Sequence, residues 1–160
     1  FESRLVHTEG AVDVPPDGSR AVYVKLESAS APLRKAVAAL SCPVVDLGTG
    51  RVGASAAKSG CFVSGDGPSE ALHAAAMTMQ GLAVVGPDTP YLRSLLGDEG
   101  YFPVGEDGEG AWKDAINQAL SEQGRALAIS ARHAIKTRYS ASECADSLEA
   151  MYRSVLEGSV

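Results

Sequence analysis

Short, continuous runs of apolar residues alternate along this chain with longer segments in which apolar residues recur every three to four positions. The first pattern is typical of strands that are covered on both faces, and the second of amphipathic helices. Strands are predicted at residues 21–24, 43–47, 61–63, 82–85 and 101–104. Pro103 predicts that the last strand lies at an edge of the sheet, because proline cannot donate a ladder hydrogen bond.

Helical periodicity follows most of these runs. We expect helices that begin at Pro32, Pro68 and Pro90, and three closing helices that include residues 112–120, 127–135 and 148–155. Strands that alternate with helices predict an α/β fold, a Rossmann-like three-layer sandwich with a mostly parallel sheet and helices on both faces. Residues 1–160 are expected to form one domain, with a leading segment at 1–20, where Leu5-Val6 is a weak apolar pair, and a C-terminal helix within 139–160.

Ligands of such folds bind at the carboxyl ends of the strands. The candidate ligand-binding loops are therefore those that follow the predicted strands, at residues 25–30, 48–53, 64–70 and 86–91.

The stretch from Cys61 to Val85 is the clearest strand, loop, helix and strand unit of the chain. In its loop, Gly67 is expected to cap the helix, Pro68 to take the first helical position, and Glu70 to lie in the first turn, where negative charge is favoured. Such a junction leaves backbone N–H groups unpaired and can hold a phosphate group. An ordinary turn between a strand and a helix is the alternative interpretation.

A second glycine-rich loop follows the second predicted strand. Gly48, Gly50 and Gly53 match the G-x-G-x-x-G pattern of dinucleotide-binding loops, and Asp66 stands at the end of the next strand. Only residues 54–59 are available for the helix that should follow, about two turns, where a Rossmann crossover needs more. We therefore favour a turn over an NAD site.

Charge and cysteine content exclude several classes of function. The chain has 20 acidic and 14 basic residues without a Lys/Arg cluster, so a nucleic-acid-binding surface is not expected. No apolar segment approaches the roughly 18 residues of a membrane-spanning helix. Cys42, Cys61 and Cys144 are far apart in the sequence, which fits reduced thiols better than disulfides or a zinc site. These features favour a soluble, cytoplasmic protein.

Several short motifs follow one another along the chain. Three of them come early: Thr8 to Asp13, Val24-Lys25-Leu26 and Leu47-Gly48-Thr49-Gly50. The later ones are Gly81 to Val85, Thr89-Pro90-Tyr91-Leu92, Gly97-Asp98-Glu99-Gly100, Phe102-Pro103-Val104, Glu109 to Ile116, Ala131-Arg132, Tyr139-Ser140 and Tyr152. In this order, over nearly the whole chain, they resemble the C-terminal, donor-binding domain of GT-B glycosyltransferases, particularly the retaining group 1 type (family 4).

The resemblance implies a domain that binds a nucleotide sugar (UDP-, GDP- or ADP-sugar) as part of a hexosyltransferase, with no metal and no further cofactor. It implies that the diphosphate lies on the helix start at Gly65 to Ser69, assisted by the cation of Lys25. A fixed cation is physically required because a nucleoside diphosphate brings about two to three negative charges. The donor-site residues implied are Lys25, Gly48, Gly50, Gly65, Asp66, Gly67, Ser69, Glu70, Thr89 and Tyr91.

The same resemblance implies that an acceptor-binding lobe precedes this chain in a two-lobed enzyme. We therefore expect the isolated domain to bind nucleotide weakly and to be inactive, because GT-B catalysis takes place between the two lobes. A peripheral association of the full-length protein with a membrane is compatible with this interpretation.

The departures from the family pattern favour a second interpretation. Family members carry one glutamate near the donor sugar and a second at the ribose, and these positions are Pro68 and Ala76 here. Glu70 replaces the first only if the loop shifts, and Tyr91 stands where the family has an acidic residue. The alternative is therefore a catalytically degenerate scaffold or interaction domain with the same fold.

A phosphoacceptor regulator of flavodoxin-like topology is a third interpretation, with Asp46 as the acceptor. It requires an acidic pair after the first strand to hold Mg²⁺, and Lys25-Leu26 stands there instead. We set this interpretation aside.

Overall fold

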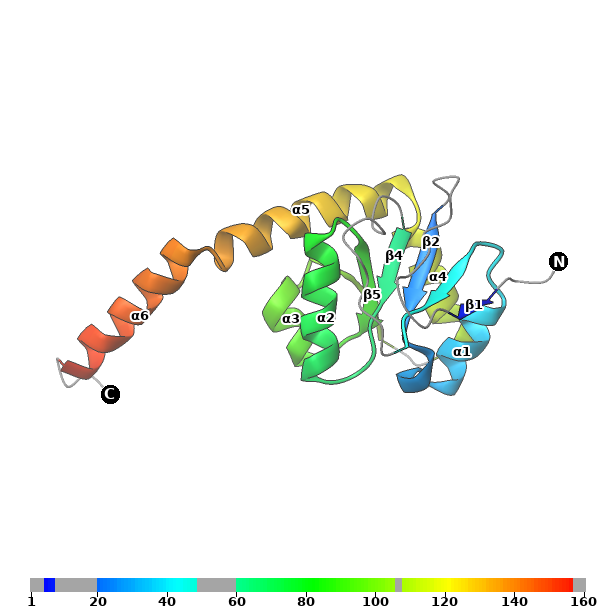
Figure 1. The fold of residues 1–160 in the computed structure, drawn as a ribbon, viewed down its shortest axis with the longest axis horizontal. Helices are drawn as coiled ribbons and strands as arrows, with labels where there is room; N and C mark the ends of the chain where they lie inside the picture. The colour runs from blue at the N-terminus through cyan, green and yellow to red at the C-terminus, as the bar shows by residue number, and fades with distance from the viewer. Residues whose placement is uncertain (1–4, 8–19, 49–59, 106–107, 157–160) are drawn as a thin grey trace.

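The computed structural model describes residues 5–7, 20–48, 60–105 and 108–156. Within them, 6 strands form one all-parallel sheet in the order β1-β3-β2-β4-β5-β6, flanked by helices on both faces (Figure 1). The strands are β1 (Leu5–His7), β2 (Ala21–Val24), β3 (Val44–Asp46), β4 (Gly60–Val63), β5 (Ala83–Pro87) and β6 (Phe102–Val104). The predicted Rossmann-like α/β fold is confirmed, and β6 is an edge strand, as Pro103 predicts.

The strand β1 is not among the predicted strands. It pairs with β3 at the other edge of the sheet, with Leu5 opposite Val44 and His7 opposite Asp46. Its sequence offers only the apolar pair Leu5-Val6, a shorter apolar run than those that predict the other strands. Part of the segment expected to lead into the domain therefore belongs to its sheet.

The connections between the strands reverse direction beside β2. From β2 the chain passes to β3 on one side, then returns to β4 on the other side of β2, and continues outward to β5 and β6. The carboxyl ends of β2 and β4 therefore lie side by side, while the helices that follow them cover opposite faces of the sheet. In open α/β sheets this topological switch point is where a crevice for ligands forms.

The helices are α1 (Ala31–Ala38), α2 (Pro68–Met79), α3 (Pro90–Leu96), α4 (Glu109–Ala119), α5 (Glu122–Arg138) and α6 (Ala141–Leu156). A short 3₁₀-helix, η1 (Leu26–Ser28), occupies the loop after β2. Side-chain caps begin α1 and α3: Ser30 accepts a hydrogen bond from the Leu33 N–H, and Thr89 from the Leu92 N–H. A proline follows each cap, where its missing N–H costs nothing, so these starts are encoded locally.

The two faces of the sheet are covered by two apolar clusters. On one face, valines of alternating strand positions pack against α1 and α4, which contribute Leu33, Trp112 and Ile116. On the other face, Tyr23 and Phe62 pack against α2, α3 and α5. Because successive strand residues point to opposite faces, the continuous apolar runs supply both clusters at once.

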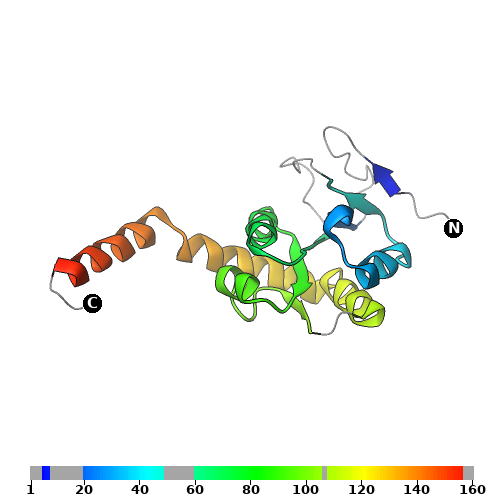
Figure 2. The ribbon, with the colours of Figure 1, turned by 90° about the horizontal axis from the view of Figure 1, so that it is seen from below.

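The last two helices differ in their surroundings. Helix α5 packs along the body of the domain, where Ala128, Ala131 and Ile135 are buried. Helix α6 contacts the end of α5 and then extends away from the sheet (Figures 1 and 2). The C-terminal helix predicted within residues 139–160 is thus present, but it does not cover the core.

Candidate ligand-binding site

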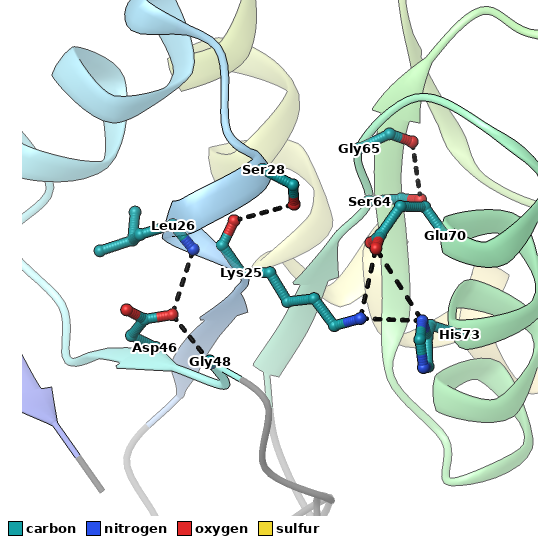
Figure 3. A network of polar contacts seen from close by, with 9 residues as sticks. All are labelled: Lys25, Leu26, Ser28, Asp46, Gly48, Ser64, Gly65, Glu70 and His73. Carbon is teal, nitrogen blue, oxygen red and sulfur yellow. Dashed lines mark hydrogen bonds and ion pairs between the residues drawn. The ribbon is translucent and has the colours of Figure 1, made fainter.

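Loops from four strands converge at the carboxyl edge of the sheet. The loop after β2 is held by Arg34, which donates hydrogen bonds to the backbone carbonyls of Glu27 and Ala29. Asp46, at the end of β3, accepts from the backbone N–H groups of Leu26 and Gly48 (Figure 3). Asp46 therefore joins two loops of the site, and this contact explains its position without a phosphoacceptor role.

Residues at the carboxyl ends of β2, β4, β5 and β6 line a pocket of about 410 Å³, which we call the edge pocket. About half of its lining residues carry a hydroxyl or carboxylate group, and Leu33, Val104 and Trp112 are among its apolar ones. The residues that line the edge pocket are Ser28, Ala29, Ser30, Leu33, Ser64, Gly65, Asp66, Pro87, Asp88, Thr89, Val104, Gly105 and Trp112. No lysine or arginine is among them, so the edge pocket suits hydroxyl groups of a ligand better than its phosphates.

The negative charge of Asp88, which lines the edge pocket, is balanced by an ion pair with Arg93. Arg93 Nε donates to its Oδ1 over 2.6 Å, a second guanidinium nitrogen donates to Oδ2, and Tyr101 Oη donates to Oδ1 over 3.2 Å. The Arg93 hydrogen bonds hold the pKa of the Asp88 carboxyl below its usual range, with a further lowering contribution from Tyr101. Burial, followed by the contact with Asp88, raises the pKa of Tyr101.

We predict that the stabilising effect of the Asp88–Arg93 pair disappears in acid. Because the folded pKa of Asp88 is depressed, the effect is complete above the unfolded carboxyl pKa of about 3.9 and is lost as the pH falls through the lower folded value. In urea unfolding, Arg93→Gln should be less stable than wild type at neutral pH, and this difference should shrink below about pH 4. In an Asp88→Asn background, Arg93→Gln should have little effect at any pH, and a difference that persists in acid would contradict the assignment.

Near Gly65, the side chains of Lys25, Glu70 and His73 form a polar cluster, the Lys25 cluster (Figure 3). Lys25 reaches from the end of β2 to the first turn of α2, where its Nζ lies 3.2 Å from Glu70 Oε1 and 2.9 Å from His73 Nδ1. An ammonium group can only donate, so this hydrogen bond requires His73 Nδ1 to accept. The pair is largely shielded from water, with side-chain exposure of 17% for Lys25 and 11% for Glu70.

Glu70 has a second carboxylate oxygen that is not paired. Its Oε2 is buried and has no hydrogen-bond partner among the described residues. A buried, unpaired carboxylate oxygen is costly, and a ligand hydroxyl or a water molecule would satisfy it. Glu70 thus combines a fixed cation contact with one vacant acceptor position.

The start of α2 lies beside this cluster. Gly67 has a φ of 103°, a conformation that glycine adopts without strain, and it supplies no side-chain cap to the first amides of the helix. A β-carbon at Gly67 would meet nothing within 4 Å, so the space around it is open. At Gly65 a β-carbon would lie 3.5 Å from Glu70 Cγ and 3.7 Å from Ser28 Oγ. A side chain at Gly65 would therefore enter the space beside both Glu70 and Ser28, and Ser28 Oγ in turn donates a hydrogen bond to the Lys25 backbone carbonyl over 3.3 Å.

Comparison with protein-family models, curated proteins and solved structures gave no match. Function is therefore argued from the site itself. None of the described helices is long and apolar enough to cross a lipid bilayer. Within the same residues, no group of three or more His, Cys, Asp or Glu side chains is arranged to hold a metal ion.

The structure brings most of the predicted donor-site residues to one edge of the sheet. Gly65, Asp66 and Thr89 line the edge pocket, and Lys25 and Glu70 meet in the Lys25 cluster. Gly67 is the N-cap of α2, Ser69 lies in its first turn, and Gly48 follows β3 and donates a hydrogen bond to Asp46. Tyr91 lies on α3, is 50% exposed and does not line the edge pocket, and Gly50 lies outside the described residues.

Several residues of the site carry no distinctive signal in the sequence. Ser28, Ser30 and Ser64 belong to the predicted loops, but serine carries no distinctive pattern. Trp112 and the Val104-Gly105 segment reach the edge pocket from α4 and β6, far along the chain. His73, three positions after Glu70 on the same helix, is the one neighbour that helical spacing could have identified.

Proposed function

We propose that this chain is the donor-binding domain of a glycosyltransferase that uses a nucleotide sugar. The observation that carries the proposal is that a pocket with hydroxyl side chains and a lysine at an open helix start lie next to each other, joined by the hydrogen bond from Ser28 Oγ to the Lys25 carbonyl. A nucleotide sugar carries groups that match both parts of the site, because its hydroxyl-rich ribose and sugar are joined by a charged diphosphate. Hydroxyl groups would donate to Asp66 in the edge pocket, and the diphosphate would accept from Lys25 and the first amides of α2.

The charged side chains of the site determine the affinity that we expect for a nucleoside diphosphate. Lys25 already neutralises Glu70, and a diphosphate must compete with that carboxylate for the ammonium group. We therefore expect weak binding of UDP, GDP or ADP, with a Kd of about 1 mM, near −4 kcal/mol. Titration of the folded chain with each nucleotide, followed by amide NMR shifts, tests this directly, and shifts should concentrate at Gly65 to Glu70.

Glu70→Gln is predicted to bind nucleoside diphosphates more tightly than wild type. The substitution keeps a hydrogen-bond acceptor for Lys25 but removes the negative charge that opposes the phosphates, which should lower the Kd for UDP by about tenfold. Uridine is the matched control ligand: it lacks the diphosphate, so its weaker binding should not change. Weaker UDP binding by Glu70→Gln would mean that Glu70 contacts the ligand rather than competing with it.

A scaffold or interaction domain of the same fold is the second candidate function. It is favoured by the internal pairing of Lys25 with Glu70 and by the absence of lysine and arginine from the lining of the edge pocket. Pro68 and Ala76, which take the positions of the two family glutamates, lie in α2, and neither carries a polar side chain. Absence of binding by wild type and Glu70→Gln at millimolar UDP, GDP and ADP would support the scaffold and refute donor binding.

A further inference from the structure

Helix α6 exposes an apolar surface that no other described element covers. Leu148, Met151 and Tyr152 share one side of the helix and are 51%, 53% and 64% exposed, and we call them the α6 apolar face. Cys144, one turn earlier, continues the same side. An amphipathic helix that extends away from its own core, as in Figure 2, gains stability only when its apolar side is covered by a partner.

The outer side of α5 has the complementary composition. Ile129 is 64% exposed, and Arg125, Arg132 and Lys136 lie with it on one exposed flank of the helix, next to the buried row that contains Ala128. We call these four residues the α5 basic stripe. In α6, by contrast, Glu143 and Glu149 flank the apolar face on its two sides. An apolar contact bordered by opposite charges can therefore form between α6 of one molecule and α5 of another.

We propose that a second copy of this chain covers the α6 apolar face, in a twofold, antiparallel pairing of the two α5–α6 segments. Helix α5 has 17 residues and α6 has 16, joined at Tyr139-Ser140, so pairing about Ser140 sets α6 of each copy along the α5 basic stripe of the other. Met151 and the partner's Ile129 are equally far from Ser140 along the chain, so they meet.

The charges fit the same register. Glu149 comes beside the partner's Arg132, and Glu143 beside the partner's Lys136. Within its own helix Glu149 is paired with Arg153 over 2.6 Å, a surface ion pair that contributes little to stability and can exchange for the partner's Arg132. The basic residues of α5 and the acidic residues that flank the α6 apolar face thus favour the α6-to-α5 arrangement. This dimer does not depend on the proposed function.

Sedimentation velocity across about 1 to 100 µM protein tests the proposal, and we expect a concentration-dependent dimer. Glu149→Lys should raise the dimer Kd by about tenfold, and adding Arg132→Glu should restore it by exchanging the charges. Asp146→Lys is the matched control, because it makes the same charge change on the side of α6 opposite the apolar face. A monomer at all concentrations, or equal effects of Glu149→Lys and Asp146→Lys, would overturn the proposal.

Cross-linking tests the register independently. In a Cys144→Ser background, Ser140→Cys lies at the expected twofold axis and should form a disulfide-linked dimer on mild oxidation. Ala150→Cys, on the polar side of α6, should not. A cross-link that forms equally at both positions would show random collision and would also overturn the proposed pairing. Circular dichroism of each variant establishes that the chain remains folded.

Discussion

Gly60→Ala should unfold at a markedly lower urea concentration than wild type, with a loss of about 3 kcal/mol in the free energy of unfolding. Gly60 pairs with Ala21 where β4 meets β2, in the middle of the sheet. A β-carbon there would lie 2.1 Å from the Ala21 carbonyl oxygen, and the φ of 149° is a conformation that residues with side chains rarely adopt. The backbone of β2 would have to move. That strand places Tyr23 in the core, and Lys25 of the candidate site follows it directly.

Gly110→Ala is the matched control for this variant. Gly110 lies in the first turn of α4, is exposed, and has open space where a β-carbon would be placed. Alanine should leave the stability unchanged or raise it by up to about 1 kcal/mol, because it reduces the entropy of the unfolded chain. If both variants lost the same stability, the close contact with Ala21 could not be the cause.

Lys25→Met should both destabilise the fold and abolish nucleotide binding. Removing the ammonium group leaves the Glu70 carboxylate shielded from water with no cation, which we expect to cost about 2–3 kcal/mol. The loss of a charge-assisted contact to the diphosphate should at the same time weaken UDP binding by more than about tenfold. Urea unfolding and an NMR titration with UDP measure the two effects separately.

The double variant Lys25→Met/Glu70→Met separates the structural role from the binding role. With both charges replaced by apolar side chains of similar size, most of the lost stability should return, because no unpaired charge is left in the cluster. UDP binding should stay absent, since neither variant offers a cation at the start of α2. A double variant as unstable as Lys25→Met would show that Lys25 stabilises the fold by packing, and one that binds UDP normally would exclude Lys25 as the phosphate partner.

Much of the fold was predictable because its determinants are local. The continuous apolar runs identify β2 to β6, since each strand supplies residues to both apolar clusters. Ser30, Thr89 and the prolines that follow them mark helix starts through contacts within one turn. The strand β1 escaped prediction because its place in the sheet depends on backbone pairing with β3 rather than on its own side-chain pattern.

The candidate site likewise has some features that depend on local sequence and others that depend on tertiary contacts. Sequence alone identified the glycine-rich loop and the capping arrangement before α2, because both depend on neighbouring residues. It also placed α6 as a helix with an apolar side. Tertiary structure alone decided that Lys25 pairs with Glu70, that Asp88 is held by Arg93 and Tyr101, and that Trp112 reaches the edge pocket. These contacts join residues from different strands and helices, and only the order of the strands brings them together.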